Sequence, residues 1–512
     1  MTDWTDGYVA DIDYTFGYYT ELNPLRLRLA FLNMGLHFPE VGIACELGFG
    51  QGMSVNMHAA ASITQWFGTD FNPAHTQFAQ QLTQVSGANA QLYEQAFNEF
   101  CNRTDLPDFD YIALHGVWSW ISEENRAVIV DFLRRKLKVG GVVYVSYNTQ
   151  PGWAAMIPMR DLLAEHADIM GSKGQGGVAR FNSALHFAEK LLSTNPQFVR
   201  DNPQISERLK NLGEQGRSYL LHEYFNRDWQ PLSFSKTAQL LSDAKLTFAC
   251  SAHYLDHVDT LNLTDEQQIF RDEIPDALFR ETVQDFCTNQ AFRRDYWVKG
   301  AIRLTLLEQT EAIRAQRVIL VQPRSDVTFK VTGSLGESTL HESIYNPILD
   351  VLSNHEIKNL GQIEQEVATL GINFGQMIQA LMVLIGAAVL FPVQEDALIA
   401  QAKKQTDPLN AHLCDKARAS DSFSCLASPV TGGGIVVPRF LQLFLLARLQ
   451  GKTQPEQWAQ FVWAILAMQN QCIIKDGIII ETANDSFTEL VIQAQTFADK
   501  QLPILIALGI CD

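Results

Sequence analysis

Residues 41–53 have the sequence Val41-Gly-Ile-Ala-Cys-Glu-Leu-Gly-Phe-Gly-Gln-Gly-Met53. The pattern predicts a short apolar strand that runs into a glycine-rich turn, and residues 54–63 can continue as a helix. Glycines at positions 48, 50 and 52 allow backbone conformations closed to other residues, and they let a ligand approach the main chain without meeting a Cβ atom. Because backbone N–H groups and the positive end of the helix dipole face such a turn, we expect an anion or nucleotide site there.

The order of residues in this turn indicates which class of nucleotide it can bind. A dinucleotide-binding GxGxxG turn needs a third glycine at position 53, where this chain has Met53. The order here is Glu46-Leu-Gly-Phe-Gly-Gln-Gly52, which resembles motif I of the class I S-adenosylmethionine (SAM) methyltransferases. Residues 64–70 predict a second strand that ends in Asp70, 18 residues beyond Gly52. An acid at about that offset can accept hydrogen bonds from both ribose hydroxyls, so we expect the turn and Asp70 to hold one nucleotide.

Composition excludes several classes of protein. A chain of 512 residues is too long for one core, so about two to four domains are expected. The net charge of −18 argues against general nucleic-acid binding, which needs clustered Lys and Arg, and it suits a basic or neutral substrate better. The 8 cysteines show no CxxC pair and no zinc-like spacing, which indicates reduced thiols in a cytoplasmic protein without a metal site.

No segment of the sequence predicts secretion or membrane insertion. The first residues have neither the basic region nor the apolar stretch of a secretory signal. Residues 377–393 form the strongest apolar run, but this run is shorter than a bilayer span and contains Gln379 and Gly386. It therefore predicts a buried helix.

The order of elements predicts an α/β fold. Apolar strands and helices alternate from 41 to 148, as is typical of a parallel sheet with helices on both faces. Strands are expected at 42–47, 65–70, 90–95, 111–115 and 141–147. Two more, at 246–254 and 291–302, would complete a Rossmann-like sheet of seven strands, the last one antiparallel. Residues 154–245 are mostly helical and would form an insertion.

The chain is expected to have three parts: an N-terminal helical lid (1–40), a SAM-binding core (41–302) with an inserted helical and regulatory block at about 154–290, and a mainly helical C-terminal domain (303–512). Helices are predicted at 341–353, 360–370 and 374–390, with a wing at Phe391-Pro-Val, which resembles a winged-helix arrangement. No basic recognition helix is present, so this domain favours protein docking or a homodimer over DNA binding. Residues 428–437 are predicted as a loop, followed by a helix at 438–449.

Ligands of a doubly wound sheet lie across the carboxyl ends of its strands, which selects the residues after each strand. Phe97 could cover the adenine face and Asn98 could reach its edge. The N-terminal tyrosines could form a plain helical cover or a lid that excludes water from the sulfonium. The predicted cofactor-binding residues are Tyr14, Tyr19, Glu46, Gly48, Phe49, Gly50, Gly52, Asp70, Phe71, Ala96, Phe97, Asn98 and His115.

Candidates for the acceptor pocket follow the fourth and fifth strands. Asn148 and Pro151 are similar to part of the NPPY box of nucleic-acid N-methyltransferases, but their spacing and position differ, so a base-flipping clamp is not expected. The segment His222-Glu-Tyr-Phe-Asn226 clusters titratable groups, although a helical His on a packed face is more often a core residue. The catalytic candidates are Trp118, Tyr147, Trp153, His222 and Glu223.

Several motifs together resemble bacterial methyltransferases that carry a methyltransferase regulatory domain, a group that includes rickettsial protein lysine methyltransferases acting on an outer-membrane protein. These motifs are Glu46–Gly52, Leu114–Trp120, Tyr147–Trp153, His222-Glu-Tyr224 and Asn289–Asp295. The resemblance implies a class I core, a regulatory block near 213–300, a winged-helix C-terminal part and SAM as the cofactor. Leu22-Asn-Pro24 departs from the Thr-His-Pro expected in relatives, which leaves the N-terminal cofactor contact open.

Three functions are consistent with these motifs. The favoured one is a SAM-dependent protein methyltransferase acting on lysine; the alternatives are a small-molecule methyltransferase and a catalytically inactive protein that binds SAM or a partner. Methyl transfer from a sulfonium is an in-line displacement that needs no metal, so positioning and desolvation carry it. A lysine acceptor must first lose its proton, against a reference pKa of about 10.4, and an apolar pocket favours that loss. Glu223 could orient the amine, yet a carboxylate also raises an amine's pKa, so it is not assigned as the base.

Overall fold

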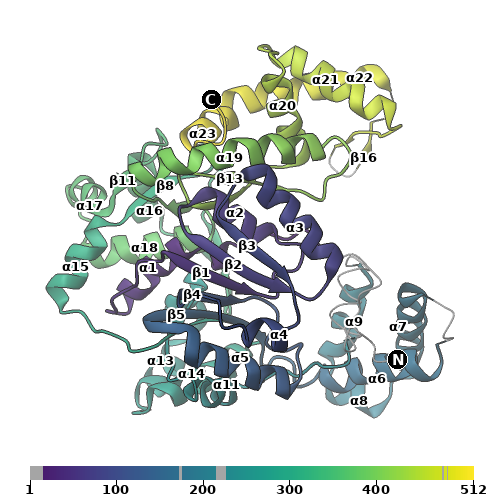
Figure 1. The fold of residues 1–512 in the computed structure, drawn as a ribbon, viewed down its shortest axis with the longest axis vertical. Helices are drawn as coiled ribbons and strands as arrows, with labels where there is room; N and C mark the ends of the chain where they lie inside the picture. The colour runs from purple at the N-terminus through teal and green to yellow at the C-terminus, as the bar shows by residue number, and fades with distance from the viewer. Residues whose placement is uncertain (1–14, 172–175, 215–225, 476–477, 481) are drawn as a thin grey trace.

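The structure is a computed structural model that describes residues 15–171, 176–214, 226–475, 478–480 and 482–512. Its central element is a seven-stranded sheet of order β3-β2-β1-β4-β5-β7-β6 (Figure 1). The first five strands run parallel, whereas β7 is antiparallel to both β5 and β6. The strands are β1 (Ile43–Leu47), β2 (Gln65–Asp70), β3 (Ala90–Glu94), β4 (Phe109–Leu114), β5 (Leu137–Asn148), β6 (Thr247–Ser251) and β7 (Phe292–Val298). The predicted seven-stranded α/β fold is confirmed.

Helices cover both faces of this sheet (Figure 1). Alternation along β1 sends Ala44 into one hydrophobic cluster and Cys45 into another on the opposite face. The first face carries α1 (Pro24–Asn33), α2 (Met53–Ala61) and α3 (Pro73–Ser86). The second carries α4 (Phe97–Cys101), α5 (Glu123–Lys136) and α11 (Phe234–Ser242).

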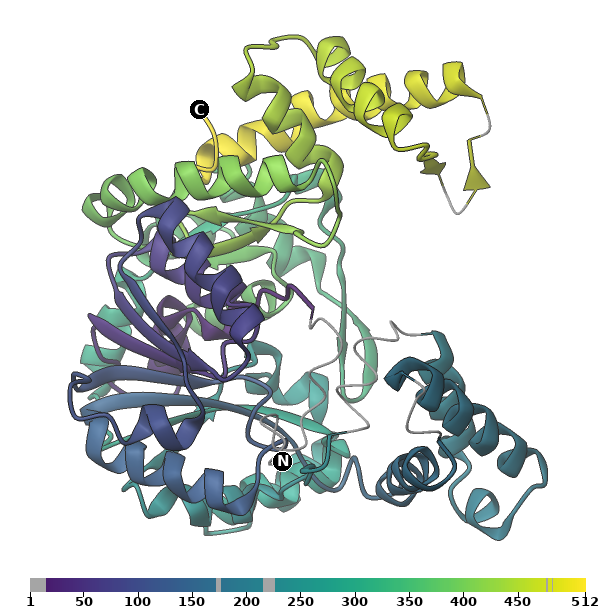
Figure 2. The ribbon, with the colours of Figure 1, turned by 45° about the vertical axis from the view of Figure 1, so that its right-hand side comes forward.

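Two groups of helices interrupt the second half of the sheet. Between β5 and β6, a helical block with its own apolar core projects from the sheet (Figure 2), as predicted for this stretch. It contains α6 (Ile157–Ile169), α7 (Gly177–Ser193), α8 (Gln197–Asp201) and α9 (Gln204–Glu214). Between β6 and β7 lie η2 (Tyr254–His257), α12 (Asp259–Asn262), α13 (Asp265–Asp272) and α14 (Ala277–Thr288).

The first part of the C-terminal region has the three predicted helices, and the winged-helix assignment remains a prediction. They are α16 (Glu342–Val351), α17 (Leu360–Ala368) and α18 (Phe374–Gly386). A small sheet of order β11-β8-β12 accompanies them, formed by β8 (Arg317–Leu320), β11 (Lys358–Asn359) and β12 (Leu390–Pro392). Helix α15 (Leu306–Ala315) and the hairpin β9 (Lys330–Gly333) with β10 (Gly336–Thr339) complete this part. Within the described ranges, no helix is long and apolar enough to cross a membrane.

The loop predicted at 428–437 is wrong, because these residues contribute to an antiparallel hairpin of β13 (Cys425–Ser428) and β14 (Gly433–Val436). Gly432, at φ +65°, supplies the tight turn. Glycine recurs in β14 because a Cβ atom on Gly434 would lie 3.1 Å from the ring of Tyr18. Consecutive glycines usually indicate a loop, and here they mark a close approach between two segments instead.

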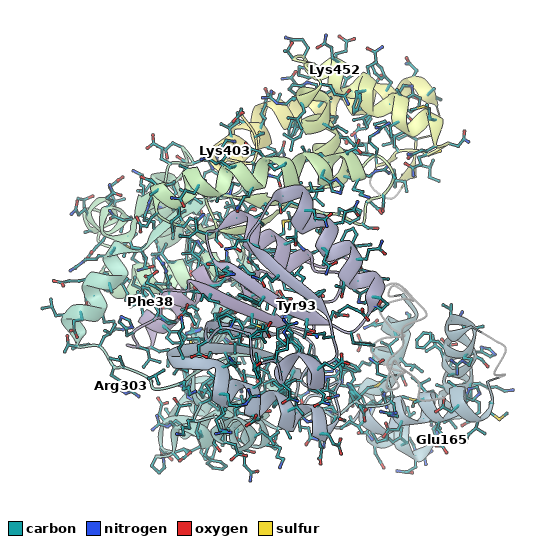
Figure 3. The ribbon with its side chains drawn as sticks, viewed as in Figure 1. Phe38, Tyr93, Glu165, Arg303, Lys403 and Lys452 are labelled. Atoms are coloured by element: carbon teal, nitrogen blue, oxygen red, sulfur yellow. The ribbon has the colours of Figure 1, made fainter. Side chains whose placement is uncertain are left out.

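The remaining helices form a cover over the first face of the sheet and an arm that projects from it (Figure 2). They are α19 (Asp396–Lys416), α20 (Arg439–Leu449), α21 (Pro455–Met468), α22 (Ala483–Thr496) and α23 (Leu502–Ala507), with η4 (Phe497–Gln501) joining the last two. Strands β15 (Ile474–Lys475) and β16 (Ile478–Ile479) pair at the end of the arm. Lys452, between α20 and α21 at the top of the view, lies far from Glu165 of α6 at the lower right (Figure 3).

One hydrophobic core joins the sheet to the C-terminal region. The cluster that contains Ala44 of β1 continues through Leu381 of α18 to Leu443 of α20. The buried Gln394 side chain strengthens the junction, since its Nε2 donates to the carbonyl oxygen of Ala61 on α2 at 2.7 Å. The hydrophobic core therefore continues across residue 303, where the C-terminal domain is predicted to begin.

Candidate active site

The glycine-rich turn connects β1 to α2 and requires its glycines. Gly48, Gly50 and Gly52 have φ angles of +74°, +56° and +72°, in the left-handed region that side-chain-bearing residues avoid. A Cβ atom on Gly48 would lie 2.6 Å from Cγ2 of Val117, and one on Gly52 would lie 2.4 Å from Cβ of Ala79. The turn is therefore pressed between the residues after β4 and helix α3.

Asp70, at the end of β2, lies directly against this turn. Its Oδ2 accepts the backbone N–H of Gly50 at 2.9 Å, and its Oδ1 accepts that of Asn72 at 2.9 Å. His75 Nδ1 lies 3.3 Å from Oδ1. The two sequence features that predict one nucleotide site are thus in direct contact, at the carboxyl ends of adjacent parallel strands.

Glu46 is a buried carboxylate beside the turn. It is 3% exposed, and its Oε2 has no hydrogen-bond partner. Burial, and then the negative charge of Asp70, raise the pKa of Glu46 to about 8. An unpartnered acid of this kind suits a ligand that brings a positive group, such as the ammonium of an amino acid. The residues present therefore fit SAM.

The other predicted cofactor residues lie around the turn at varying depth. Phe97 begins α4, is partly exposed, and has its ring tip 3.6 Å from the Cβ position of Gly48. Phe49 is buried, whereas Phe71 is partly exposed. Ala96 and Asn98 are exposed, and the Asn98 side chain accepts a hydrogen bond from Asn102 at 2.9 Å. Their contacts with a cofactor remain predictions.

The described part of the N-terminal segment crosses the same edge of the sheet. The backbone N–H of Tyr19 donates to Ser54 Oγ in the first turn of α2 at 2.9 Å. The Tyr19 ring stacks on His115 with ring centroids 3.8 Å apart. Tyr14 lies outside the described residues. Asn23, in the tripeptide that departs from the expected relatives, caps α1 and donates to the carbonyl oxygen of Thr431 at 2.9 Å.

His115 connects the end of β4 to β5. Its Nδ1 lies 2.9 Å from the hydroxyl of Tyr144 and 3.3 Å from Oγ of Ser146. Burial lowers the pKa of His115 to about 4, with a smaller opposing effect of Glu21. The imidazole is therefore neutral at pH 7, and it can exchange hydrogen bonds without adding charge to the site.

The predicted catalytic residues do not form one cluster. Trp118 and Tyr147 are buried together on the α5 face, where the Tyr147 hydroxyl donates to Asp295 Oδ2 at 2.8 Å. Trp153 belongs to the core of the helical block, with its ring 5.1 Å from that of Trp229. His222 and Glu223 lie outside the described residues. The catalytic roles remain predictions.

Two charged residues that the sequence did not single out lie on the other side of β5 from Tyr147. Glu21, on η1 (Thr20–Leu22), has Oε1 3.5 Å from Nε of Arg294 on β7. Arg294 is the register partner of Ser146. Burial alone raises the pKa of Glu21, but the positive charges of Arg294 and Arg26 outweigh it, and the pKa is lowered. The alternation of side chains along β7 could have indicated this, because it places Arg294 on the face of the sheet opposite to its neighbours in the sequence.

A buried ion cluster occupies the opposite face of β7. Arg293 donates to Asp295 at 2.9 Å, to Asp285 at 2.6 Å and to Glu281 at 2.8 Å. A cavity of about 400 Å³ borders this cluster. Burial raises the pKa of Asp285 to about 7, against the lowering effect of Arg293. Through Asp295 and Tyr147, the cluster is hydrogen-bonded to the end of β5.

Comparisons with known proteins agree with this architecture. The family model described as predicted methyltransferase regulatory domain matches residues 216–299. The uncharacterized protein sll1526 of Synechocystis sp. is 39% identical over 512 residues, which cover 99% of each chain. The uncharacterized protein RP789 of Rickettsia prowazekii is 25% identical over 302 residues, covering 55% of this chain and 51% of its own.

Among solved structures, PKMT2 from Rickettsia typhi in complex with AdoHcy superposes with a TM-score of 0.71 and 18% identity, over 97% of this chain and 100% of that chain. A second structure of PKMT2 from Rickettsia typhi gives a TM-score of 0.67. These likenesses confirm the class I methyltransferase fold, and the family model confirms the resemblance to methyltransferases that carry a regulatory domain. The predicted bounds of the domains remain predictions.

Proposed function

This chain belongs to the family of the Synechocystis protein sll1526, and from that premise and its class I methyltransferase fold we propose that it transfers a methyl group from SAM to a lysine side chain of a protein. The observation that carries this proposal is the hydrogen bond between the Gly50 N–H and Asp70, which joins the glycine turn to the acid at the end of β2. The R. typhi protein PKMT2, which has a similar fold, is in complex with AdoHcy, and this supports SAM as the methyl donor. The motifs that resemble rickettsial protein lysine methyltransferases support a protein as the acceptor.

The cofactor would lie across the ends of β1, β2 and β4. The turn at 48–52 would hold its amino-acid end, with Glu46 facing the ammonium group, and the free lone pairs of Asp70 would accept the ribose hydroxyls. Phe97 would cover the adenine. When bound, SAM supplies a methyl group activated by the sulfonium, and this chain supplies the position of that group and a site sheltered from water.

The acceptor would enter beside His115. Tyr19 stacked on the imidazole shields this part of the strand edge from solvent, and the imidazole is neutral, so a neutral amine meets no fixed positive charge on that ring. The net charge of −18 favours approach of a basic segment over an acidic one. All eight cysteines are free, which supports the expected cytoplasmic location. The C-terminal region would serve substrate docking or homodimer contact.

Incubation with methyl-labelled SAM and a fractionated cell lysate tests this function. We expect label in proteins, and acid hydrolysis of the labelled fraction should release methylated lysine. Gly50→Val serves as the binding-deficient control. Label confined to small solutes would support a small-molecule methyltransferase instead, and calorimetric affinity for SAM without any transfer would support an inactive binding protein.

A further inference from the structure

The edge of the sheet divides into two halves of different chemistry. The turn and Asp70 occupy the ends of β1 and β2, and we have assigned them to the cofactor. The ends of β4, β5 and β7 form the other half, which begins at His115 and reaches Arg294. Since a methyl donor and its acceptor must meet in line, this second half is where an acceptor nitrogen would lie.

Aromatic rings form the walls of this second half. The Tyr19 ring stacks on His115 at 3.8 Å, and the Phe292 ring meets the imidazole edge-on at 6.4 Å. The guanidinium of Arg294 lies 5.3 Å from the centre of the Phe292 ring. Tyr19 and Phe292 are both partly exposed, so a side chain from another molecule can reach this surface.

Beside Arg294, the Glu21 carboxylate can accept further hydrogen bonds. Its side chain is 16% exposed, and its one ionic contact within the described ranges is the 3.5 Å approach of Arg294. That distance is longer than a charge-assisted hydrogen bond. Glu21 stays ionised, because the nearby positive charges lower its pKa.

The charge balance of the pair decides which form of an amine it suits. A lone carboxylate would raise the pKa of a bound lysine and keep it protonated, which blocks methyl transfer. The positive charge of Arg294 offsets this effect, so the pair offers a hydrogen-bond acceptor with no net charge. Arg26, whose guanidinium is buried with Nε and Nη1 unpartnered, acts on Glu21 in the same direction.

We propose that Glu21 and Arg294 form the acceptor subsite, in which the neutral amine of a lysine side chain donates an N–H to the Glu21 carboxylate between the rings of Tyr19, His115 and Phe292. This proposal rests on the methyltransferase function proposed above and names the residues that recognise its acceptor. Glu21 orients the nitrogen lone pair toward the methyl group, and Arg294 keeps the amine unprotonated.

The transfer step is balanced without a further reactant. The amine lone pair forms the new N–C bond as the S–CH3 bond breaks, and the electron pair of that bond stays on sulfur. The nitrogen then carries the positive charge beside the Glu21 carboxylate, which is a favourable position for charge that develops in the transition state. The methylated ammonium leaves with both of its protons and stays charged in water at neutral pH, since the proton was lost before the transfer, when the lysine became neutral.

Two variants separate the roles of the pair. Glu21→Gln keeps the shape but removes the charge that stabilises the developing ammonium, so its single-turnover rate should fall roughly 100-fold. Arg294→Gln leaves Glu21 uncompensated, so the apparent pKa on the acid limb of its rate profile should rise by about 1, which lowers the rate most below neutral pH. The substrate is the lysate fraction that wild-type protein labels best, used with enzyme in excess over acceptor.

Calorimetry with SAM alone provides the second readout, and both variants should bind SAM within about twofold of wild type. The matched control is Glu337→Gln, which breaks a surface pair with Lys330 on the β9–β10 hairpin and should change neither readout. Lost SAM affinity in Glu21→Gln, an unchanged rate in that variant, or an unchanged acid limb in Arg294→Gln overturns the subsite. Wild-type protein that binds SAM but labels no protein overturns the proposed function itself, so the two failures are distinguishable.

Discussion

The cofactor half and the acceptor half of the strand edge differ in the groups that form them. In the cofactor half, the backbone of one continuous stretch forms the site, because three glycines in left-handed conformations bend the chain against Asp70. In the acceptor half, side chains from segments far apart in the sequence meet, as Glu21 does with Arg294. The first kind of site is visible as a motif. The second kind exists only after the strands have paired.

The largest expected effect comes from the ion cluster on the face of β7 opposite to the acceptor half. Arg293→Met should lower the free energy of unfolding by about 3–5 kcal/mol at pH 8, because the buried carboxylates of Asp285 and Asp295 lose their guanidinium partner. The loss should shrink at pH 6, where Asp285, with its pKa raised to about 7, takes up a proton. Urea unfolding at both pH values measures this. Arg418→Met, which breaks an exposed pair with Asp415, is the control, and a similar loss in both variants would contradict the buried cluster.

The cofactor side should respond through binding more than through stability. Gly50→Val places a β-branched residue at φ +56°, so SAM affinity should fall by about 100-fold or more, while the strained backbone costs about 1–2 kcal/mol of stability. Calorimetric titration with SAM measures the affinity. Gly87→Val is the matched control, since Gly87 has φ +66° with open space around it at the end of α3. It should lose similar stability and keep its affinity for SAM.

Glu46 should make the free energy of unfolding depend on pH. Its folded-state pKa of about 8 lies above the unfolded value near 4.5, so its contribution to stability is complete below about pH 4.5 and is lost as pH rises through 8. The wild-type free energy of unfolding should therefore fall across this window relative to Glu46→Gln, by at most about 1.4 kcal/mol per pH unit. Urea unfolding of both proteins from pH 5 to pH 9 checks the slope, and parallel profiles would refute it.

The smallest effect should come from Asn23, the N-cap of α1, which also contacts the turn of the β13–β14 hairpin. Asn23→Ala removes the N-cap of α1 together with the hydrogen bond to Thr431, so it should cost about 1–2 kcal/mol. Asn373→Ala removes only a cap, that of α18, and should cost about 1 kcal/mol. The difference between the two thermal unfolding free energies isolates the contact with the C-terminal hairpin. Equal costs would mean that this contact adds nothing.

The sequence predicts the sheet well because its strands are apolar runs bounded by turns, and β2 is predicted with both of its ends. It fails at residues 428–437, where glycines serve a close approach to Tyr18 inside a strand pair. The partners of the acceptor half escape prediction for another reason. The face on which Tyr147 or Arg294 lies depends on strand register, and register is fixed by pairing between segments more than 140 residues apart.

The continuous core beneath α2 has a consequence for dissecting this protein. Helix α2, which begins at the glycine turn, packs against the β13–β14 hairpin and receives the amide of Gln394 at its last residue. A fragment of residues 1–302 would therefore lose the packing behind the nucleotide site and expose an apolar surface to water. Catalytic fragments obtained by truncation should precipitate or lose ligand, whereas trimming the distal arm beyond α20 leaves that junction intact.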